Sequence, residues 1–488
     1  MNLRRFIAIG ATALSLGSSG VLAQSYIWTG LGGNSNWTTA LNWDLGVPNQ
    51  GSGTHLTFGN LTQYVSTVNT AYTVGNITVI FLSADFSLNS LASSVLTLDG
   101  TFRNFSANTV AINAAIAGPG GFQLRGSGTT LFGSTSNTYS GSTMLSSGIM
   151  TDAAANSFSP NSTVVLSGSG TLNASFDETI GGLQGAGGTV TLATSGKTLT
   201  LNTSANPSFS GTIGGPGSLV IGGTGTQTLS GLNTYSGGTI VQSELFVGSS
   251  TNGPPTGFTA GPVGTGLLAF EFLAEFSPSA NVTIANPIFL NDDVQYIDND
   301  DGGNFNMTLT GLITGPSGLE WCTPGILELT GANTFQGGVD MREGTLLLGS
   351  STIGPPTGII SGPIGTGGLV LDTGTDLAAV LPSVTLANPI DITGNTQIGA
   401  GPSDNNALIL SGAITGGGAV TFSAGPTGTL TLSGANSYNG DTTISGGTLI
   451  AANSLAFGCS SNNVNLNGGG LDVASGVTIS NNINTTAG

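Results

Sequence analysis

The chain has 488 residues, of which 81 are glycine and 6% are charged, and its formal net charge at pH 7 is −18. The basic residues beyond residue 23 are Arg103, Arg125, Lys197 and Arg342, too few to neutralise phosphate groups, so we expect neither nucleic acid nor anionic lipid as a partner. The hydrophobic share, 38%, is too high for a disordered chain, and two cysteines are too few for a disulfide framework.

The first residues have the layout of a secretory signal peptide. "MNLRR" is a short basic start, "FIAIGATALSLG" is an apolar run too short to span a bilayer, and "VLAQS" offers a cleavage site after Ala23. We therefore expect residues 1–23 to be removed, the mature chain to begin near Gln24, and the protein to be exported. No later run reaches the roughly 18 apolar residues of a membrane helix, so we expect no transmembrane segment in the mature chain.

Three tryptophans, Trp28, Trp37 and Trp43, crowd residues 24–60. The first coil of a stacked structure exposes its core and an open strand edge, so we predict that residues 24–60 form an aromatic N-terminal cap. A sugar-binding aromatic cluster is the alternative. His55, the single histidine, has no zinc-site spacing to the distant cysteines and the chain has no GxSxG elbow, so we expect an exposed strand residue.

Residues 61–488 are organised by internal repeats, which must be found before any fold is assigned. Four segments align on one aromatic residue each, at intervals of 96, 100 and 103 residues: Tyr139, Tyr235, Phe335 and Tyr438. Other phrases recur in pairs: GPPTG at 253–257 and 354–358, GPVGTG at 261–266 and GPIGTG at 362–367, VTIANPI at 282–288 and VTLANPI at 384–390. The spacing indicates imperfect repeats of about 100 residues.

Each unit contains short apolar or alternating runs, such as TLTLSG and GTLLLG, that end at Gly, Asn or Ser, which is typical of strands and turns. Two architectures fit: a parallel β-helix with coils of about 20–25 residues, or a row of β-sandwich domains of about 100 residues each. Short strands, scattered glycines and the lack of long hairpin pairs favour an all-β parallel β-helix. About 22 residues per coil gives about 21 coils and a rod of roughly 100 Å.

Acidic residues supply the candidates for catalysis. Asp177 with Glu178, and Glu271 with Glu275, are the tight pairs available for hydrolysis, which needs two carboxylates about 5 to 9.5 Å apart. A lyase acting on acidic sugars would also need basic residues gathered in its groove, and the four basic residues are dispersed. We therefore expect no enzyme, no catalytic residue and no cofactor.

The segment "NDDVQYIDNDDGGN" concentrates negative charge, and its carboxylates are Asp292, Asp293, Asp298, Asp300 and Asp301. Calcium prefers such clusters on turns, but the spacing fits neither an EF-hand loop nor a glycine-rich nonapeptide repeat. We expect a solvated loop and no metal site, with a weak calcium site as the alternative.

Cys322 and Cys459 are 137 residues apart, or about six coils, which separates them by roughly 30 Å at ~4.8 Å per coil. A disulfide needs Cα atoms within about 7 Å. We predict that no disulfide joins them.

The repeat is clearest in "LTLSGANSYNGDTTISGGTLIAA", from residue 430. It predicts three strands: Leu430–Leu432, Thr442–Ile444 and Thr448–Ala451. Leu432, Ile444 and Leu449 are expected to point inward, and Asn or Thr side chains at equivalent corners to stack in ladders. Tyr438 is expected to cover apolar surface at a corner, with stacking on a carbohydrate as the alternative.

This pattern closely resembles the autotransporter-associated β-strand repeat, best in YNG at 438–440 followed by SGGTL at 445–449. YSGGT at 235–239, and FQGG at 335–338 with EGTL at 343–346, follow it, and the segment at Tyr139 is the most degraded. The opening "YIWTGLGGNSNWTTALNWDLGVP" is similar to the start of large exported proteins with this repeat. The resemblance implies a bacterial surface or secreted protein with a right-handed β-helical passenger region, active in adhesion, cell–cell contact or surface display.

The sequence departs from the resemblance at its C-terminal end. A complete autotransporter ends in an outer-membrane barrel of alternating strands, whereas "VTISNNINTTAG" aligns with "VTLANPIDITGN" from 384. We expect an incomplete last unit without a barrel, so that outer-membrane association would need an anchor supplied elsewhere.

The sequence as a whole predicts a non-enzymatic structural or adhesion protein of the cell surface, whose partners would be surface glycans or other surface proteins. A secreted carbohydrate-binding or carbohydrate-active β-helix is the alternative.

Overall fold

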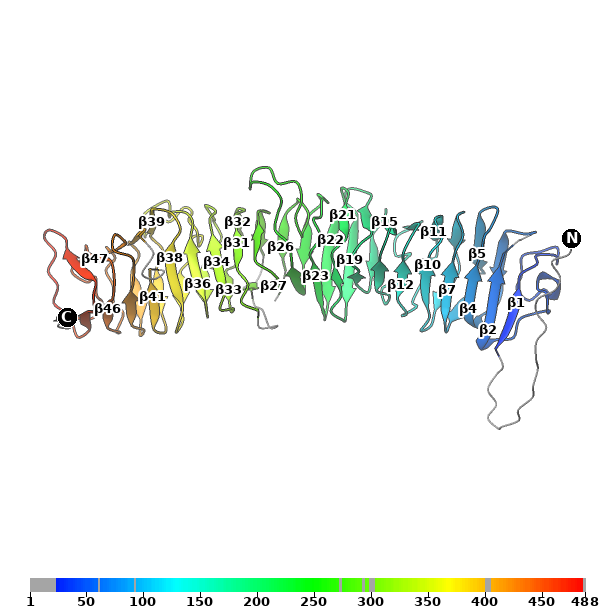
Figure 1. The fold of residues 1–488 in the computed structure, drawn as a ribbon, viewed down its shortest axis with the longest axis horizontal. Coiled ribbons are helices and arrows are strands. Elements are labelled where there is room, and N and C mark those ends of the chain that lie inside the picture. The colour runs from blue at the N-terminus through cyan, green and yellow to red at the C-terminus, as the bar shows by residue number, and fades with distance from the viewer. Residues whose placement is uncertain are drawn as a thin grey trace, which may run out of the picture.

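The computed structural model describes residues 23–59, 62–91, 94–271, 274–291, 295–297, 303–399 and 405–485. These residues form one long rod of stacked coils, with β1 (Gln24–Ile27) near one end of the rod and β47 (Thr448–Ala451) near the other (Figure 1). The fold is an all-β parallel β-solenoid of about 20 turns with about 21 residues per turn. The predicted leader lies outside the described residues, except for Ala23.

Six parallel sheets form the wall of the rod, and each overlaps the next along the axis. Their first and last strands are β1 (Gln24–Ile27) and β17 (Leu183–Gln184), β3 (Val65–Val68) and β21 (Thr212–Gly214), β16 (Glu178–Ile180) and β32 (Ile313–Thr314), β20 (Ser208–Phe209) and β43 (Ile414–Gly416), β28 (Val282–Ile284) and β50 (Asn482–Thr485), and β39 (Ser383–Leu386) and β49 (Gly470–Val473). Among the described residues one short 3-10 helix, η1 (Ala40–Asn42), accompanies the strands.

A coil has three sides in the middle of the rod. The consecutive strands β26 (Leu268–Phe270), β27 (Glu275–Pro278) and β28 belong to three different sheets. β26 pairs with β29 (Ile288–Leu290), which places Leu268 beside Ile288, 20 residues later. The ladder hydrogen bonds therefore run along the rod and join successive coils, as expected for strands too short to be stable alone.

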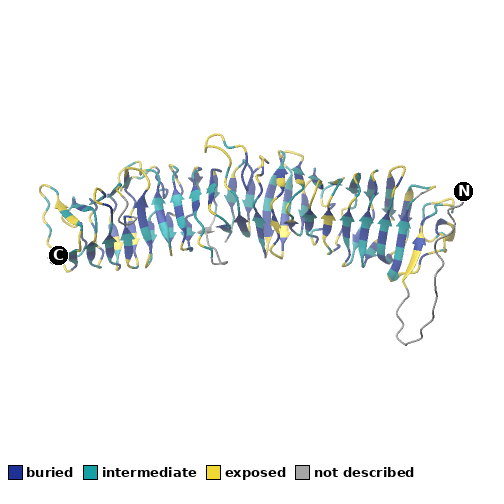
Figure 2. Ribbon diagram, viewed as in Figure 1, coloured by how far each residue is buried: buried dark blue, intermediate teal, exposed yellow. Residues whose placement is uncertain are grey.

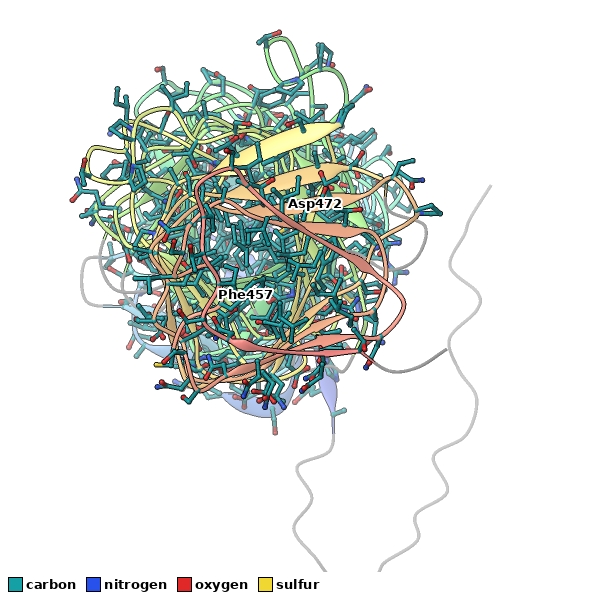
Figure 3. All side chains as sticks on the ribbon, turned by 90° about the vertical axis from the view of Figure 1, so that its left-hand side faces the viewer. Phe457 and Asp472 are labelled. Atoms are coloured by element: carbon teal, nitrogen blue, oxygen red, sulfur yellow. The ribbon has the colours of Figure 1, made fainter. Side chains whose placement is uncertain are left out.

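Side chains alternate between the core and the outer surface along most strands (Figure 2), as the period of two requires. In β45 (Thr429–Leu432) the threonines are half-buried, while Leu430 and Leu432 are buried. The inward residues of nearly every coil join one continuous hydrophobic core. In the end-on view Phe457 lies inside the ring of strands (Figure 3).

The prediction of a parallel β-solenoid is confirmed, and the alternative of separate β-sandwich domains is wrong, because strands of successive coils pair in parallel throughout. Two predicted strands match β46 (Thr442–Ile444) and β47 (Thr448–Ala451), and the third is one residue longer as β45. Leu432, Ile444 and Leu449 are all buried, as predicted.

Candidate functional site

The aromatic residue of each repeat lies inside the core. Tyr139, Tyr235, Phe335 and Tyr438 are all 0% exposed. Tyr438 packs on apolar core residues at its corner, as expected, but it is fully buried. The alternative of carbohydrate stacking is wrong, because the ring has no face in solvent. The repeated segment is a structural corner, and its other residues explain why.

A buried asparagine stands two residues before each aromatic. The Oδ1 atom of Asn333 accepts a hydrogen bond from the backbone N–H of Ile313 at 2.9 Å, and its Nδ2 donates to the carbonyl of Pro363 at 2.7 Å. The same two bonds recur at Asn137 with Ile116 and Ser157, Asn233 with Ile213 and Pro262, and Asn436 with Ile414 and Ala456. Each side chain thus fastens its own coil to the coil before and the coil after.

The predicted ladders of stacked polar side chains occur in part. Thr143 bonds to Ser162 at 3.0 Å and Thr375 to Thr396 at 3.2 Å, in both cases between coils in the interior. Asparagine pairs such as Asn113 with Asn89 and Asn484 with Asn465 do bond along the axis, but they lie on the exposed surface. At the repeated corner the amide bonds to backbone groups, because these groups are buried and have no water to bond.

Each tyrosine of the repeat hydrogen-bonds to the threonine four residues later. The Tyr438 hydroxyl lies 2.6 Å from Thr442 Oγ1, and the pairs Tyr139–Thr143 and Tyr235–Thr239 repeat the contact. In the third unit phenylalanine replaces the tyrosine at Phe335, and valine replaces the threonine four residues later at Val339. Both hydroxyls of the pair are therefore absent together. The pair changes as a unit, so that at these two positions no copy buries a hydroxyl without its partner.

The glycine two residues after each aromatic allows the coils to touch. A Cβ atom on Gly337 would lie 2.4 Å from the backbone nitrogen of Gly318 in the preceding coil. At Gly141, Gly237 and Gly440 it would lie 2.2–2.5 Å from backbone atoms of the preceding coil. A side chain there would force the coils apart.

The paired phrases of the central units meet in neighbouring coils. Asn286 of VTIANPI donates to the carbonyls of Gly264 and Gly266 in GPVGTG, at 3.2 and 2.8 Å. Asn388 makes the same contacts in the next unit. Each GPPTG phrase forms the exposed tip of a hairpin, one of which projects beside β26 (Figure 1).

The three tryptophans pack against one another and are 0–3% exposed. Their indole N–H groups donate to Gln63 O, Ser66 Oγ and Trp37 O, respectively. This packing suits the predicted cap and leaves no ring face for a sugar.

Asp177 and Glu178 point to opposite sides of the wall, since they are consecutive in an extended segment. Asp177 is exposed and pairs with Lys197 at 2.9 Å, an interaction that lowers the pKa of Asp177. Glu178 is buried and accepts hydrogen bonds from the N–H groups of Ser157 and Phe158, at 2.9 and 2.8 Å. Burial raises the pKa of Glu178 to about 7 despite these bonds.

Glu271 and Glu275 also lie on different sides of the coil, because Glu271 follows β26 and Glu275 begins β27 in another sheet. Glu271 accepts a hydrogen bond from Gln242 at 2.8 Å. Neither pair therefore converges on a common cleft, which removes the geometry that hydrolysis requires.

His55 lies on the outer face of β2 (Gly51–Phe58), half-buried, with Nδ1 2.8 Å from Asn76 Nδ2. It is a strand residue as expected, but its neighbour covers it partly. No disulfide joins Cys322 to Cys459, which confirms that prediction. The calcium candidates Asp292, Asp293, Asp298, Asp300 and Asp301 lie outside the described residues.

Arg342 forms an ion-pair cluster that the sequence did not reveal. Its guanidinium contacts Glu320 and Asp340 at 2.9 Å and Asp372 at 3.1 Å, from three adjacent coils. Strand register brings these side chains together, because Glu320 pairs beside Asp340 in parallel strands. With its cation already engaged, the cluster is a structural tie.

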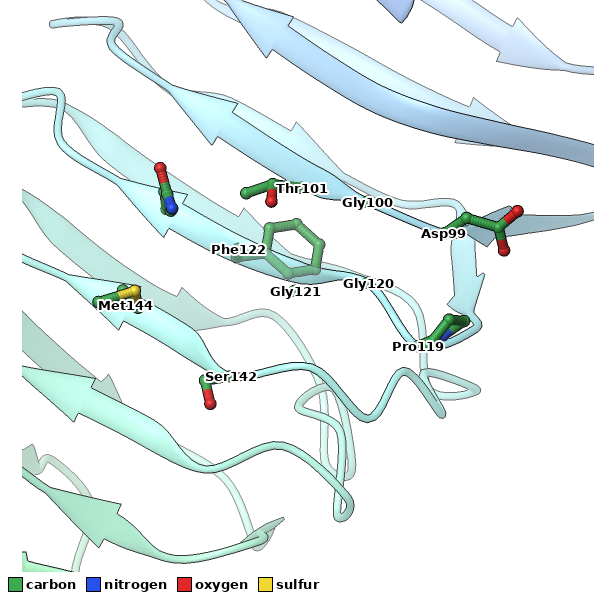
Figure 4. A pocket seen from close by; sticks show the side chains of 10 residues that line it. Asp99, Gly100, Thr101, Pro119, Gly120, Gly121, Phe122, Ser142 and Met144 are labelled. Carbon is green, nitrogen blue, oxygen red and sulfur yellow. The ribbon is translucent and has the colours of Figure 1, made fainter. Parts of the chain in front are cut away.

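A shallow depression of about 310 Å³ lies on the outside of the wall (Figure 4). Gly100, Gly120 and Gly121 leave this stretch without side chains, and Asp99 is the one ionisable group that lines it. A single carboxylate has no partner here for acid–base chemistry. Among the described residues no three His, Cys, Asp or Glu side chains are grouped as a metal site would need, and no helix is long and apolar enough to cross a membrane.

Comparison with known proteins identifies the repeated corner. The model of the passenger-associated-transport repeat matches residues 124–151, 222–243, 324–348 and 427–451, each of which contains one aromatic anchor. The chain is also similar to the adhesin BmaC autotransporter of Brucella suis biovar 1 (strain 1330), with 29% identity over 330 residues. That match covers 64% of this chain and 9% of the relative, so the chain spans a small part of that protein. No solved structure matches.

The four matched segments coincide with the four corners that share one asparagine bridge, one buried aromatic and one glycine contact. The resemblance to autotransporter repeats is thereby confirmed, and the chain is a β-solenoid that carries four passenger-associated-transport repeats.

Proposed function

We propose that this chain is an exported, non-enzymatic rod that presents binding surfaces at the bacterial surface and acts in adhesion. One observation supports the proposal most directly. The asparagine, aromatic and glycine that recur in each repeat all make contacts within or between coils, so each added repeat lengthens the rod. The passenger-associated repeats and the similarity to a protein named an adhesin support the same function. The proposal includes right-handed coiling, units of about 100 residues, and glycans or other surface proteins as partners.

A carbohydrate-active enzyme fits the geometry less well. Its acidic pairs lie on different faces, and Arg342, the one arginine with three carboxylate contacts, is committed to its ion-pair cluster. The hairpin tips and the exposed residues around the corners, which vary between units, are the places where specificity would lie.

The test uses beads coated with the exported chain, incubated with bacterial and animal cells, and a parallel assay for release of reducing sugar from a polysaccharide panel. We expect adherence above beads coated with an unrelated acidic protein, and no sugar release. Sugar release, or adherence no greater than the control, would contradict the proposed function.

A further inference from the structure

Two surface depressions occupy equivalent positions in the first and the fourth repeat. One, of about 300 Å³, includes Asn137 and Thr138, and the other, of about 310 Å³, includes Asn436 and Ser437. In both, the asparagine is the buried bridge of the corner and the hydroxyl residue that follows it is exposed. The same local construction therefore produces the same hollow at two distant places on the rod.

The far wall is equivalent as well. Asn137 donates to the carbonyl of Ser157, and Asn436 donates to the carbonyl of Ala456. The next residue in each case is a buried phenylalanine, Phe158 in the first unit and Phe457 in the fourth. Phe158 itself lines the first hollow, and Phe457 comes directly before Gly458, which lines the second.

The two central repeats are built differently at this place. There the bridging asparagines donate to Pro262 and Pro363, which belong to the phrases that follow the projecting hairpins. The turn that walls the hollow in the outer repeats is thus replaced by the root of a hairpin.

The lining of both hollows mixes hydroxyl and amide groups with apolar side chains and carries no charged side chain, in a chain whose net charge is −18. The first combines hydroxyl and amide residues with Phe158 and Pro160, and the second combines four serines with Leu455. The described residues make no hydrogen bond to the side chains of Thr138 or Ser437, so these hydroxyls are available to a ligand. Hydroxyl and amide groups beside apolar side chains match a neutral saccharide, which presents both hydroxyl groups and C–H faces, and the absence of charged side chains from the lining offers no ion pair to an ionic ligand.

We propose that the two depressions are equivalent binding subsites for an uncharged saccharide. The inference rests on the proposed adhesive function and names its ligand class and its location. Each shallow subsite binds weakly, and two of them on one rigid rod bind a glycan-covered surface by avidity.

The experiment places the full exported chain on an array of neutral and acidic oligosaccharides, then measures binding to a surface coated with the retained glycan. Thr138→Leu and Ser437→Leu each remove a hydroxyl and add bulk at an exposed position. Ser140→Leu, on the same turn but outside the depression, is the matched control. Circular dichroism verifies that all variants are folded.

We expect neutral glycans to be retained, each single variant to weaken surface binding at least about tenfold, the double variant to bind at background, and the control to stay within about twofold of wild type. Retention of acidic glycans alone, no retention, or a double variant that binds like wild type would overturn the inference. Cell adherence of the double variant separates the two proposals: adherence that persists without glycan retention rejects the subsites and leaves the adhesive function standing.

Discussion

Replacing Asn333 by leucine removes a side chain that joins three coils while nearly preserving its volume. The residue is 0% exposed, and its two hydrogen bonds, of 2.9 and 2.7 Å, satisfy the N–H of Ile313 and the carbonyl of Pro363. Each buried backbone group left without a partner costs about 1–3 kcal/mol. Asn333→Leu should therefore destabilise the surrounding coils by about 2–6 kcal/mol.

Hydrogen exchange measured by mass spectrometry is the appropriate assay, because a long repeat array does not unfold in one step. Peptides that contain Ile313 should lose protection in Asn333→Leu. The matched control is Asn252→Leu, the same change on an exposed hairpin, which should cost under about 0.5 kcal/mol.

Asn333→Asp sharpens the test. At neutral pH its carboxylate would face the Pro363 carbonyl in the core, which raises the pKa of the new acid and destabilises the fold. Protonation restores a donor, so protection should return as the pH falls. Equal exchange in wild type and Asn333→Leu, or an aspartate variant insensitive to pH, would refute the role of the bridge.

Three further changes test neighbouring features. Phe335→Tyr and Val339→Thr should each cost about 1–3 kcal/mol by burying a hydroxyl without a partner, and the double variant should regain most of that loss in a double-mutant cycle. Gly337→Ala should cost about 1–3 kcal/mol or more by overpacking, whereas Gly257→Ala, in open space, should be nearly neutral in denaturant unfolding. Burial raises the pKa of Glu178 to about 7, so its protonated form stabilises the fold at low pH and this stability is lost as the pH rises through 7. In Glu178→Gln the melting temperature should therefore change less with pH between pH 5 and 8 than it does in the wild type.

Each of these results has a clear contrary outcome. Additive costs in the double variant would mean that the hydroxyl pair is not a unit. A tolerated alanine at Gly337 would mean that the coils are not in contact there. A wild-type pH profile in Glu178→Gln would place the titrating group elsewhere.

Much of the architecture follows from the sequence, because strand length, turn residues and repetition are local properties. The inward positions Leu432, Ile444 and Leu449 could be predicted from alternation alone. The full burial of Tyr438 could not: its flanking turn residues placed it at a corner over apolar surface, and they gave no sign that Asn436 is buried beside it by bonding to both adjacent coils.

The side-chain contacts between coils could not be predicted from the sequence. The Arg342 cluster joins residues 20–30 positions apart, which only the length of each coil brings together. Coils that carry a hairpin are longer, so the sequence separation between neighbouring side chains varies from coil to coil, and no fixed spacing could reveal the cluster. The co-occurrence of Tyr with Thr, and of Phe with Val, was a signal in the sequence that a comparison of the four copies could have found.

The most direct test of the repeat as a unit of length is deletion of residues 233–332, which joins Leu232 to Asn333 at the same corner. Strand register from Thr239 passes through Leu268, Ile288 and Ile313 before it reaches the coil of Asn333. Those four coils correspond to ~19 Å at ~4.8 Å each.

Small-angle X-ray scattering should show a folded rod shortened by ~19 Å, with an unchanged β-sheet circular dichroism spectrum per residue. Deletion of residues 233–282, which removes half a unit, should instead disrupt folding. An unchanged maximum dimension, or two deletions that behave alike, would contradict the account.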